Sequence, residues 1–148
     1  MKEGAIRPKA VCVVRRGAEF LVSGAVDSVK GERFYGPLGG GIEFGEHAAD
    51  AVRREMMEEL GAEIVDVRPL GVLENLFTYE GRPGHEIVFV FAARFADASL
   101  YGRDELRWTE SDGTEWRAEW LPLDFFADGG PPLYPTGLRE LLEQDPSS

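Results

Sequence analysis

The sequence predicts an α/β domain in which a mixed β-sheet lies between helices. Most of the chain consists of short runs of β-branched and apolar residues separated by turns rich in glycine or proline, a pattern typical of strands. Residues 47–60 instead repeat apolar residues every three or four positions, which is the period of a helix, and a shorter segment of this kind closes the chain. Strands that flank one strong helix, with a second helix at the end, favour a sheet covered by helices.

The first strands are expected at residues 9–16 and 19–25, joined as a hairpin by two residues. Cys12, the one cysteine in the chain, lies in the apolar run of the first strand, so we expect a buried and unreactive thiol and no intrachain disulfide. Residues 33–45 are rich in glycine and proline and are expected to form a loop.

The main helix is expected at residues 47–60. Gly61 suits the left-handed residue that commonly ends a helix. The apolar residues that share one face of this helix are Ala49, Val52, Met56 and Leu60.

The remaining chain alternates between expected strands and turns. Residues 63–80 form one long or two short strands, a turn follows at 81–84, and a buried strand follows at 85–95. A polar connection over residues 96–105 precedes a strand at 114–123, in which Trp116 and Trp120 are expected to be core or interface residues. The last expected element is a short helix with Thr136 as its N-cap and with leucines facing the core. The chain contains no repeat and no linker, so one domain over residues 1–148 is expected.

The charge of the chain limits its partners. It has 27 acidic and 16 basic residues and a net charge of -11, which argues against sequence-independent binding to long nucleic acids. A small ligand that carries phosphate would need a bridging cation. No apolar run approaches the ~18 residues of a spanning helix, and the N-terminus does not resemble a signal peptide, so we expect a cytoplasmic protein without membrane association.

Acidic residues are crowded in the second half of the main helix. Glu55 shares a helix face with Glu58 and Glu59, at spacings of three and four residues. Like charges at these spacings destabilise a helix by about 0.2–0.5 kcal/mol per pair. A hard divalent cation such as Mg²⁺ would remove the repulsion, since it binds carboxylate oxygens and is typically shared with substrate phosphates. Gly40, in the glycine-rich segment before the helix, is a candidate for a further ligand through its carbonyl oxygen.

A solvated ladder of ion pairs along Asp50, Arg54 and Glu58 is the alternative reading of the same charges. The wider pattern favours the metal site. From Gly40 to Ala62 the sequence reads GGIEFGEHAADAVRREMMEELGA, which resembles the Nudix box, G-x5-E-x7-R-E-U-x-E-E-x-G-U, where U is a bulky apolar residue. Every fixed position of the box matches, and Ala62 is small for the last apolar position.

The resemblance implies a Nudix hydrolase with an α/β/α sandwich that spans residues 8–143. Such an enzyme uses Mg²⁺ or Mn²⁺ to cleave the pyrophosphate bond of a nucleoside diphosphate linked to another moiety, such as an NTP, an NDP-sugar or a dinucleoside polyphosphate. It implies Glu55 and Glu59 as the principal metal ligands and Glu58 as a further ligand or the general base. Arg54 points roughly 100° away from Glu55 around the helix, so we expect it to orient a carboxylate through an ion pair with Glu46, a supporting residue.

Outside the box, Tyr35 and Tyr79 are candidates for stacking on a nucleobase, together with Phe34 and Phe77, and packing in the core or at the rim is the alternative. Glu86, with the preceding His85, is a candidate distal acid or base, and a solvated strand end is the alternative. Glu43 is expected on the loop surface. The N-terminal cations Lys2, Arg7 and Lys9 are expected in a solvated segment rather than at phosphate.

Two other functions stay open. A module of the same fold could sense a nucleotide without turning it over, although such a module has no need for three carboxylates that repel one another. An enzyme of this family could also remove pyrophosphate from the 5′ end of RNA, and the acidic charge argues against this. The longer signatures of members that cleave NADH or coenzyme A are absent. Dimers are frequent in the family, so a homodimer is one possible assembly.

Overall fold

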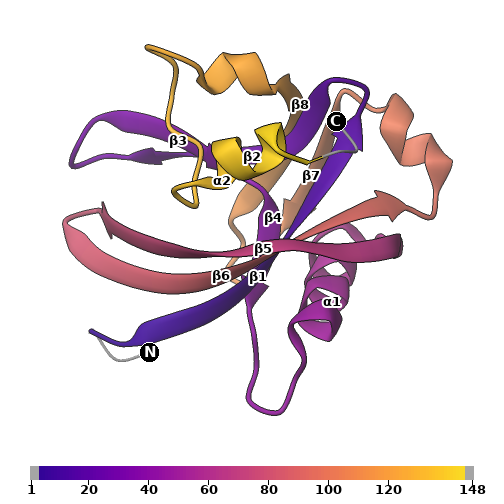
Figure 1. Ribbon diagram of the computed structural model, residues 1–148, viewed down its shortest axis with the longest axis horizontal. Helices are drawn as coiled ribbons and strands as arrows, with labels where there is room; N and C mark the ends of the chain where they lie inside the picture. Colours follow the sequence, from indigo (N-terminus) through magenta and orange to yellow (C-terminus); the bar gives the residue numbers. More distant parts are fainter. Residues whose placement is uncertain (1–3, 146–148) are drawn as a thin grey trace.

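Eight strands form one mixed β-sheet in residues 4–145, the part of the chain that the computed structural model describes (Figure 1). The strands are β1 (Ile6–Arg16), β2 (Glu19–Asp27), β3 (Glu32–Gly36), β4 (Leu38–Gly41), β5 (Ile64–Tyr79), β6 (Arg82–Phe95), β7 (Glu105–Thr109) and β8 (Glu115–Pro122). Their order is β5-β6-β1-β2-β8-β7, with β3 paired to β2 and β4 paired to β1. The β1–β6 pair is parallel and the other pairs are antiparallel, as a mixed sheet requires.

Helices cover both faces of this sheet. They are α1 (Ala48–Leu60), α2 (Leu138–Glu143) and the 3-10 helices η1 (Ala98–Gly102) and η2 (Leu123–Phe126). Alternate side chains of β1 show the layering, because Cys12 and Val14 belong to the core that includes Met56 of α1, whereas Val11 and Val13 belong to the core with α2 and η2. The predicted sheet between helices is confirmed. No helix within residues 4–145 is long and apolar enough to cross a membrane.

Several predicted elements are confirmed with small changes at their ends. The helix predicted at 47–60 is α1, the hairpin is β1–β2, and the strand predicted at 114–123 is β8. The segment at 63–80 is one strand, β5, whose register with β6 shifts twice, between Val65 and Arg68 and between Pro69 and Gly71. Cys12 is 1% exposed, and burial raises the pKa of its thiol to about 12, so this thiol is an inert core group.

The loop predicted at residues 33–45 is wrong, because this segment contains β3 and β4. Strand β4 consists of Leu38 and three glycines and pairs with residues 9–12 of β1. A Cβ atom on Gly39 would overlap the carbonyl oxygen of Ala10, and the φ angle of Gly39 is 155°. Glycine is therefore used here for a close approach of two backbones, which composition alone cannot distinguish from a flexible loop.

The turn predicted at residues 81–84 is present but is shorter and begins one residue earlier. The hairpin turns at Glu80 and Gly81, whose φ angles are 51° and 78°, and Tyr79 pairs with Arg82. Pro83 lies inside β6, where it pairs with Thr78 of β5. Pairing with β1 begins only at His85, so the absent N–H of proline costs no ladder bond at this position.

Two further predictions are corrected at the C-terminal side. The polar connection expected at 96–105 contains η1 and runs into β7, a short strand with a charged sequence. Thr136 does not cap the last helix, which follows Gly137 instead. The N–H and hydroxyl groups of Thr136 both donate to Oδ1 of Asn75, at 3.1 and 3.2 Å, so this threonine holds the segment to β5.

Candidate active site

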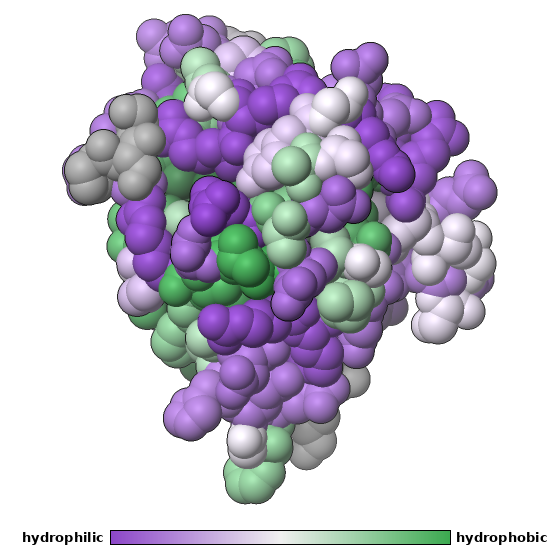
Figure 2. Space-filling view, turned by 90° about the vertical axis from the view of Figure 1, so that its right-hand side faces the viewer, coloured by the Kyte–Doolittle hydropathy of each residue, from purple (hydrophilic) through white to green (hydrophobic). Residues whose placement is uncertain are grey.

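The orientation of α1 follows from its apolar face. Val52 and Met56 are fully buried against the sheet, and the helix ends at Gly61, with a φ angle of 63° and an N–H that donates to the carbonyl of Met57 at 2.9 Å. This packing leaves the side chain of Glu55 16% exposed and that of Glu58 58% exposed. Figure 2 shows the face of the molecule that is on the right in Figure 1, where α1 lies. This face is largely hydrophilic and surrounds a smaller hydrophobic area.

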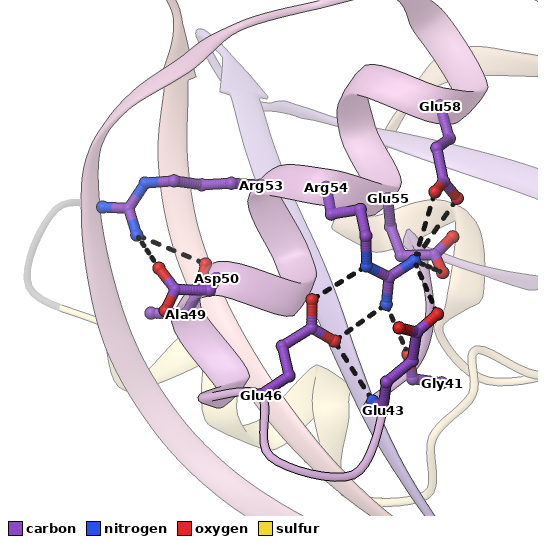
Figure 3. A network of polar contacts seen from close by, with 9 residues as sticks. All are labelled: Gly41, Glu43, Glu46, Ala49, Asp50, Arg53, Arg54, Glu55 and Glu58. Atoms are coloured by element: carbon purple, nitrogen blue, oxygen red, sulfur yellow. Dashed lines mark hydrogen bonds and ion pairs between the residues drawn. The ribbon is translucent and has the colours of Figure 1, made fainter.

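Arg54 is the centre of a polar network at the start of the site (Figure 3). Its Nε and Nη2 atoms donate to both carboxylate oxygens of Glu46, at 2.8 and 2.9 Å, and Nη2 also donates to the carbonyl of Gly41 at 3.0 Å. The predicted ion pair between Arg54 and Glu46 is therefore present. Nη1 contacts Glu55 at 3.0 Å and Glu58 at 3.3 Å. The hydrogen bonds from Arg54 lower the pKa of Glu46 to about 2.

Only half of the alternative ion-pair ladder is present, because Arg54 contacts Glu58 but not Asp50. Asp50 contacts Arg53 at 3.7 Å, and these two side chains lie apart from the Arg54 network (Figure 3). Glu43 is exposed, as predicted, with one carboxylate oxygen 3.9 Å from Nη1 of Arg54.

Glu55 and Glu59 sit in an environment that opposes their negative charge. Burial, followed by the charges of Glu55 and Glu110, raises the pKa of Glu59 to about 8, against a weaker lowering by Lys9 and by the N–H of Gly39. Burial likewise raises the pKa of Glu55, although Arg54 opposes that change. Oε1 of Glu59 is buried and has no hydrogen-bond partner among the described residues. A buried oxygen left unsatisfied costs about 1–3 kcal/mol, so it marks a place where a ligand would be stabilising.

Gly40 lies directly against the Glu55 carboxylate. A Cβ atom at position 40 would lie 2.5 Å from the carboxyl carbon of Glu55 and 2.6 Å from each of its oxygens. Glycine is needed here because any side chain would displace the carboxylate from β4.

The carboxylate oxygens of this site are suitable ligands for a divalent cation, although they do not converge on one point. Within residues 4–145, no three His, Cys, Asp or Glu side chains form a group that could already hold a metal ion. The unsatisfied oxygen of Glu59 and the mutual repulsion of Glu55, Glu59 and Glu110 are nevertheless features that a hard cation would relieve. Glu58, the third predicted ligand of the helix, contacts Arg54 instead.

The sequence did not predict Glu110 as a residue of this site. It follows β7, and Oε1 accepts a hydrogen bond from the indole N–H of Trp108 at 3.1 Å. Its charge raises the pKa of both Glu55 and Glu59, so it faces the same site. Nothing near the box indicates it, since it is brought to α1 by a strand that the sequence did not predict.

A cleft of about 520 Å³ extends from these acidic residues to the tips of two hairpins. The predicted substrate contacts Tyr35, Tyr79 and Glu86 all line it, as do Phe34 and Phe77. Other aromatic residues that line it were not predicted as contacts: Trp108, Trp116 and Tyr134. The expected core position holds for Trp120, which is 5% exposed, whereas Trp116 lies at the cleft wall.

The cleft contains few cations among its described lining residues. Lys9 lies on β1, not in a solvated segment, and its Nζ atom is 3.5 Å from the Glu86 carboxylate. Arg7 is exposed on the same strand, and Lys2 lies outside the described residues. His85 contacts Glu74 at 3.1 Å and does not line the cleft.

Comparison with known proteins identifies the family of the chain. Residues 6–143 match the NUDIX domain family. The chain is 34% identical over 110 residues to the "NAD-capped RNA hydrolase NudC" of Mycobacterium tuberculosis, which covers 69% of this chain and 34% of that protein. It is 29% identical over 111 residues to the protein of the same name from Pseudomonas syringae pv. tomato, covering 72% and 37%. The chain thus spans about a third of the length of these curated relatives.

Solved structures show the same fold. The MutT NUDIX hydrolase from Burkholderia pseudomallei superposes with a TM-score of 0.61 at 24% identity and covers 95% of this chain and 98% of that chain. The mMutator MutT protein from Bacillus halodurans gives a TM-score of 0.60 at 18% identity and covers 93% and 80%. With the family match over most of its length and every fixed box position in place around α1, the chain belongs to the Nudix family of hydrolases.

Proposed function

We propose that the chain is a single-domain hydrolase that uses a divalent cation to cleave the pyrophosphate bond of a nucleoside diphosphate linked to another moiety. The observation that carries this proposal is the state of Glu59. It is a partly buried carboxylate with an unsatisfied oxygen and a raised pKa, and it stands next to Glu55 and Glu110 where the cleft begins. A module that only binds a nucleotide has no need for carboxylates that repel one another. A metal-dependent enzyme needs these carboxylates as ligands of its cation.

Glu55 and Glu59 would hold the cation, Mg²⁺ or Mn²⁺, with the carbonyl of Gly40 as a backbone ligand. Glu58 would join them, which requires it to exchange its exposed contact with Arg54 for the metal. The cation would neutralise phosphate oxygens and lower the pKa of a bound water. Arg54, fixed by both oxygens of Glu46, would keep the Glu55 carboxylate in place.

The proton of the attacking water needs an acceptor. Glu58 is the acceptor that the family resemblance implies, and Glu110 is a second candidate from the structure. Glu110 lines the cleft itself, whereas Glu58 does not, which supports Glu110 for substrates that fill the cleft. Exchanging each of them for glutamine would separate the two assignments.

The aromatic part of the cleft would take the nucleobase. Phe34 and Tyr79 meet edge to face with ring centroids 5.7 Å apart, one from each wall, and Phe77 lies nearby on the strand of Tyr79. Lys9, which contacts Glu86 and whose charge lowers the pKa of Glu59, would bind the phosphates. Glu86, which is 9% exposed, would position this lysine.

A second candidate substrate is the dinucleotide cap of an RNA. It is favoured by the 34% identity to a protein named as an NAD-capped RNA hydrolase. The net charge of -11 disfavours binding to the RNA body. The longer signature of NADH-cleaving members is also absent from the sequence.

One experiment tests the function and ranks the substrates. Purified protein is incubated with Mg²⁺ and a panel of NTPs, NDP-sugars, ADP-ribose, dinucleoside polyphosphates, NAD and a short NAD-capped RNA, and products are separated by ion exchange. We expect turnover that is lost in excess EDTA and poorly restored by Ca²⁺, which accepts a looser geometry than Mg²⁺. Reaction in H₂¹⁸O would identify the attacked phosphorus. Full turnover in EDTA would refute the metal site. The homodimer and the cytoplasmic location stay predictions, and light scattering would test the first.

A further inference from the structure

Two hairpins form opposite walls of the aromatic part of the cleft. The β2–β3 hairpin contributes Phe34 and Asp27, and the β5–β6 hairpin contributes Phe77 and Tyr79. These hairpins lie on different branches of the sheet, and among the described residues no strand of one pairs with a strand of the other. No strand ladder within residues 4–145 therefore fixes the distance between the two walls at their tips, so this distance depends on contacts between the hairpins.

The tips of the hairpins are joined by a small set of hydrogen bonds. Oδ2 of Asp27 accepts from the N–H of Glu80 at 3.2 Å. In return, the Glu80 carboxylate accepts from the N–H of Ser28 at 2.9 Å and from its hydroxyl at 2.7 Å. We call these three residues the Asp27–Ser28–Glu80 bridge.

Asp27 has an unusual position for a carboxylate. It is 2% exposed, and its Oδ1 atom accepts from the N–H groups of Val29 and Lys30, at 3.0 and 3.1 Å. One oxygen thus shapes the turn of its own hairpin while the other holds the opposite hairpin. Both oxygens are used, which explains how a charge can be buried at the cleft wall.

Glu80 has an unusual backbone. Its φ angle of 51° is in the left-handed region, where glycine or asparagine is the ordinary choice at this turn position. A glutamate that keeps this conformation needs compensation, and its side-chain bonds to Ser28 supply it. Two independent features, a buried carboxylate and a strained glutamate, therefore meet at the same contact.

We propose that the Asp27–Ser28–Glu80 bridge sets the width of the aromatic cleft and so positions the nucleobase. This inference rests on the proposed function, since it concerns the same cleft. The bridge lies at the open tips of the hairpins, beyond Phe34 and Tyr79, and does not include the carboxylates of α1. Its residues are positioning residues: they act on the base through the walls that they hold together.

Glu80→Gly is the most informative variant. Glycine keeps the N–H that donates to Asp27 and relieves the left-handed backbone, but it removes the carboxylate that binds Ser28. We expect an unchanged or higher melting temperature together with a KM for the best nucleotide substrate that rises about 5- to 10-fold, while kcat changes less than about twofold. Asp27→Asn, a nearly isosteric change, should raise KM at least as much.

The measurements must separate base binding from phosphate binding and from stability. The Kd of a non-hydrolysable nucleotide analogue should rise with KM in both variants, whereas the inhibition constant of inorganic pyrophosphate, which lacks a base, should not change. Hydrogen exchange of residues 28–31 and 79–82 should be faster in both variants. The matched control is Asp97→Ala, which removes a carboxylate that accepts from the N–H of Ser99 at 3.0 Å in a turn that does not line the cleft.

The outcomes are distinct. Wild-type turnover with unchanged KM and Kd in Glu80→Gly and Asp27→Asn would overturn the bridge and leave the proposed function intact. An equal weakening of pyrophosphate, or an equal effect of Asp97→Ala, would also overturn it. If the wild-type protein neither hydrolyses nor binds any nucleotide, the proposed function fails, and the bridge with it.

Discussion

Replacing Glu59 with glutamine should stabilise the metal-free protein at alkaline pH, because it removes a carboxylate whose ionisation the fold opposes. The pKa of Glu59 is about 8 in the folded chain, compared with an ordinary value of 4.5. Between these values the folded state binds more protons than the unfolded state, so the free energy of unfolding falls as the pH rises from about 4.5 to about 8.

The size of the effect follows from the same difference in pKa. Each unit of pKa difference corresponds to about 1.4 kcal/mol, so the whole difference would change the free energy of unfolding by roughly 5 kcal/mol. Glu59 retains some contact with water, which screens its charge, so we expect roughly 1–3 kcal/mol. Glutamine keeps the shape of the side chain and an oxygen that can accept from the N–H of Gly39.

Urea unfolding in EDTA at pH 5 and at pH 8.5 would measure this. Wild type and Glu59→Gln should have similar free energies of unfolding at pH 5, where Glu59 is protonated, and Glu59→Gln should be the more stable protein at pH 8.5. Added Mg²⁺ should then stabilise the wild type more than the variant, as expected for a ligand that binds the folded state. The exposed Glu43→Gln should behave as the wild type at both values.

The reasoning would be refuted if Glu59→Gln were the less stable protein at pH 8.5 in EDTA. Such a result would mean that the Glu59 carboxylate is satisfied by a partner in the folded chain. If the free energies of unfolding of the two proteins differed by the same amount at both pH values, the pKa of Glu59 would not be raised in the folded chain.

Three other predictions concern neighbouring residues. Glu55→Gln and Glu59→Gln should each lower kcat by ~10²-fold or more, on the scale of lost electrostatic stabilisation, and should raise the Mg²⁺ concentration for half activity, as steady-state assays would show. Arg54→Ala should lower the unfolding free energy of the metal-free protein in urea titrations, because it leaves Glu46 and Glu55 without their shared cation. Gly40→Ala should fold normally by circular dichroism but lose activity at least about tenfold, because its Cβ atom displaces the Glu55 carboxylate.

Each of these three predictions would be contradicted by a specific result. Full turnover in both glutamine variants would mean that the carboxylates of α1 are a solvated face. A stable Arg54→Ala protein would show that its ion pairs contribute little net energy. A fully active Gly40→Ala protein would place the cation away from β4.

Local regularities account for the part of the molecule that was predictable. The period of three and four residues in α1 needs no distant contact, so Val52 and Met56 could be placed in the core, and Glu55 and Glu59 one turn apart, from the sequence. The Arg54–Glu46 ion pair was predictable for a similar reason, since the start of the helix and its preceding loop are close in the chain. Short, glycine-rich or charged strands lack such a signal, and β3, β4 and β7 were missed for that reason.

The sequence by itself determined the family, the helix that carries the acidic residues and the spacing of those acids along the helix. The tertiary structure decided which of those acids is buried. Glu58 and Glu59 are adjacent in the chain and alike in chemistry. The side chain of Glu58 is exposed beside Arg54, whereas Oε1 of Glu59 is buried. Glu110 reaches them from β7, and Asp27 meets Glu80 across two hairpins. Desolvation and contact across the sheet depend on how distant segments pack, and no local pattern of residues contains that information.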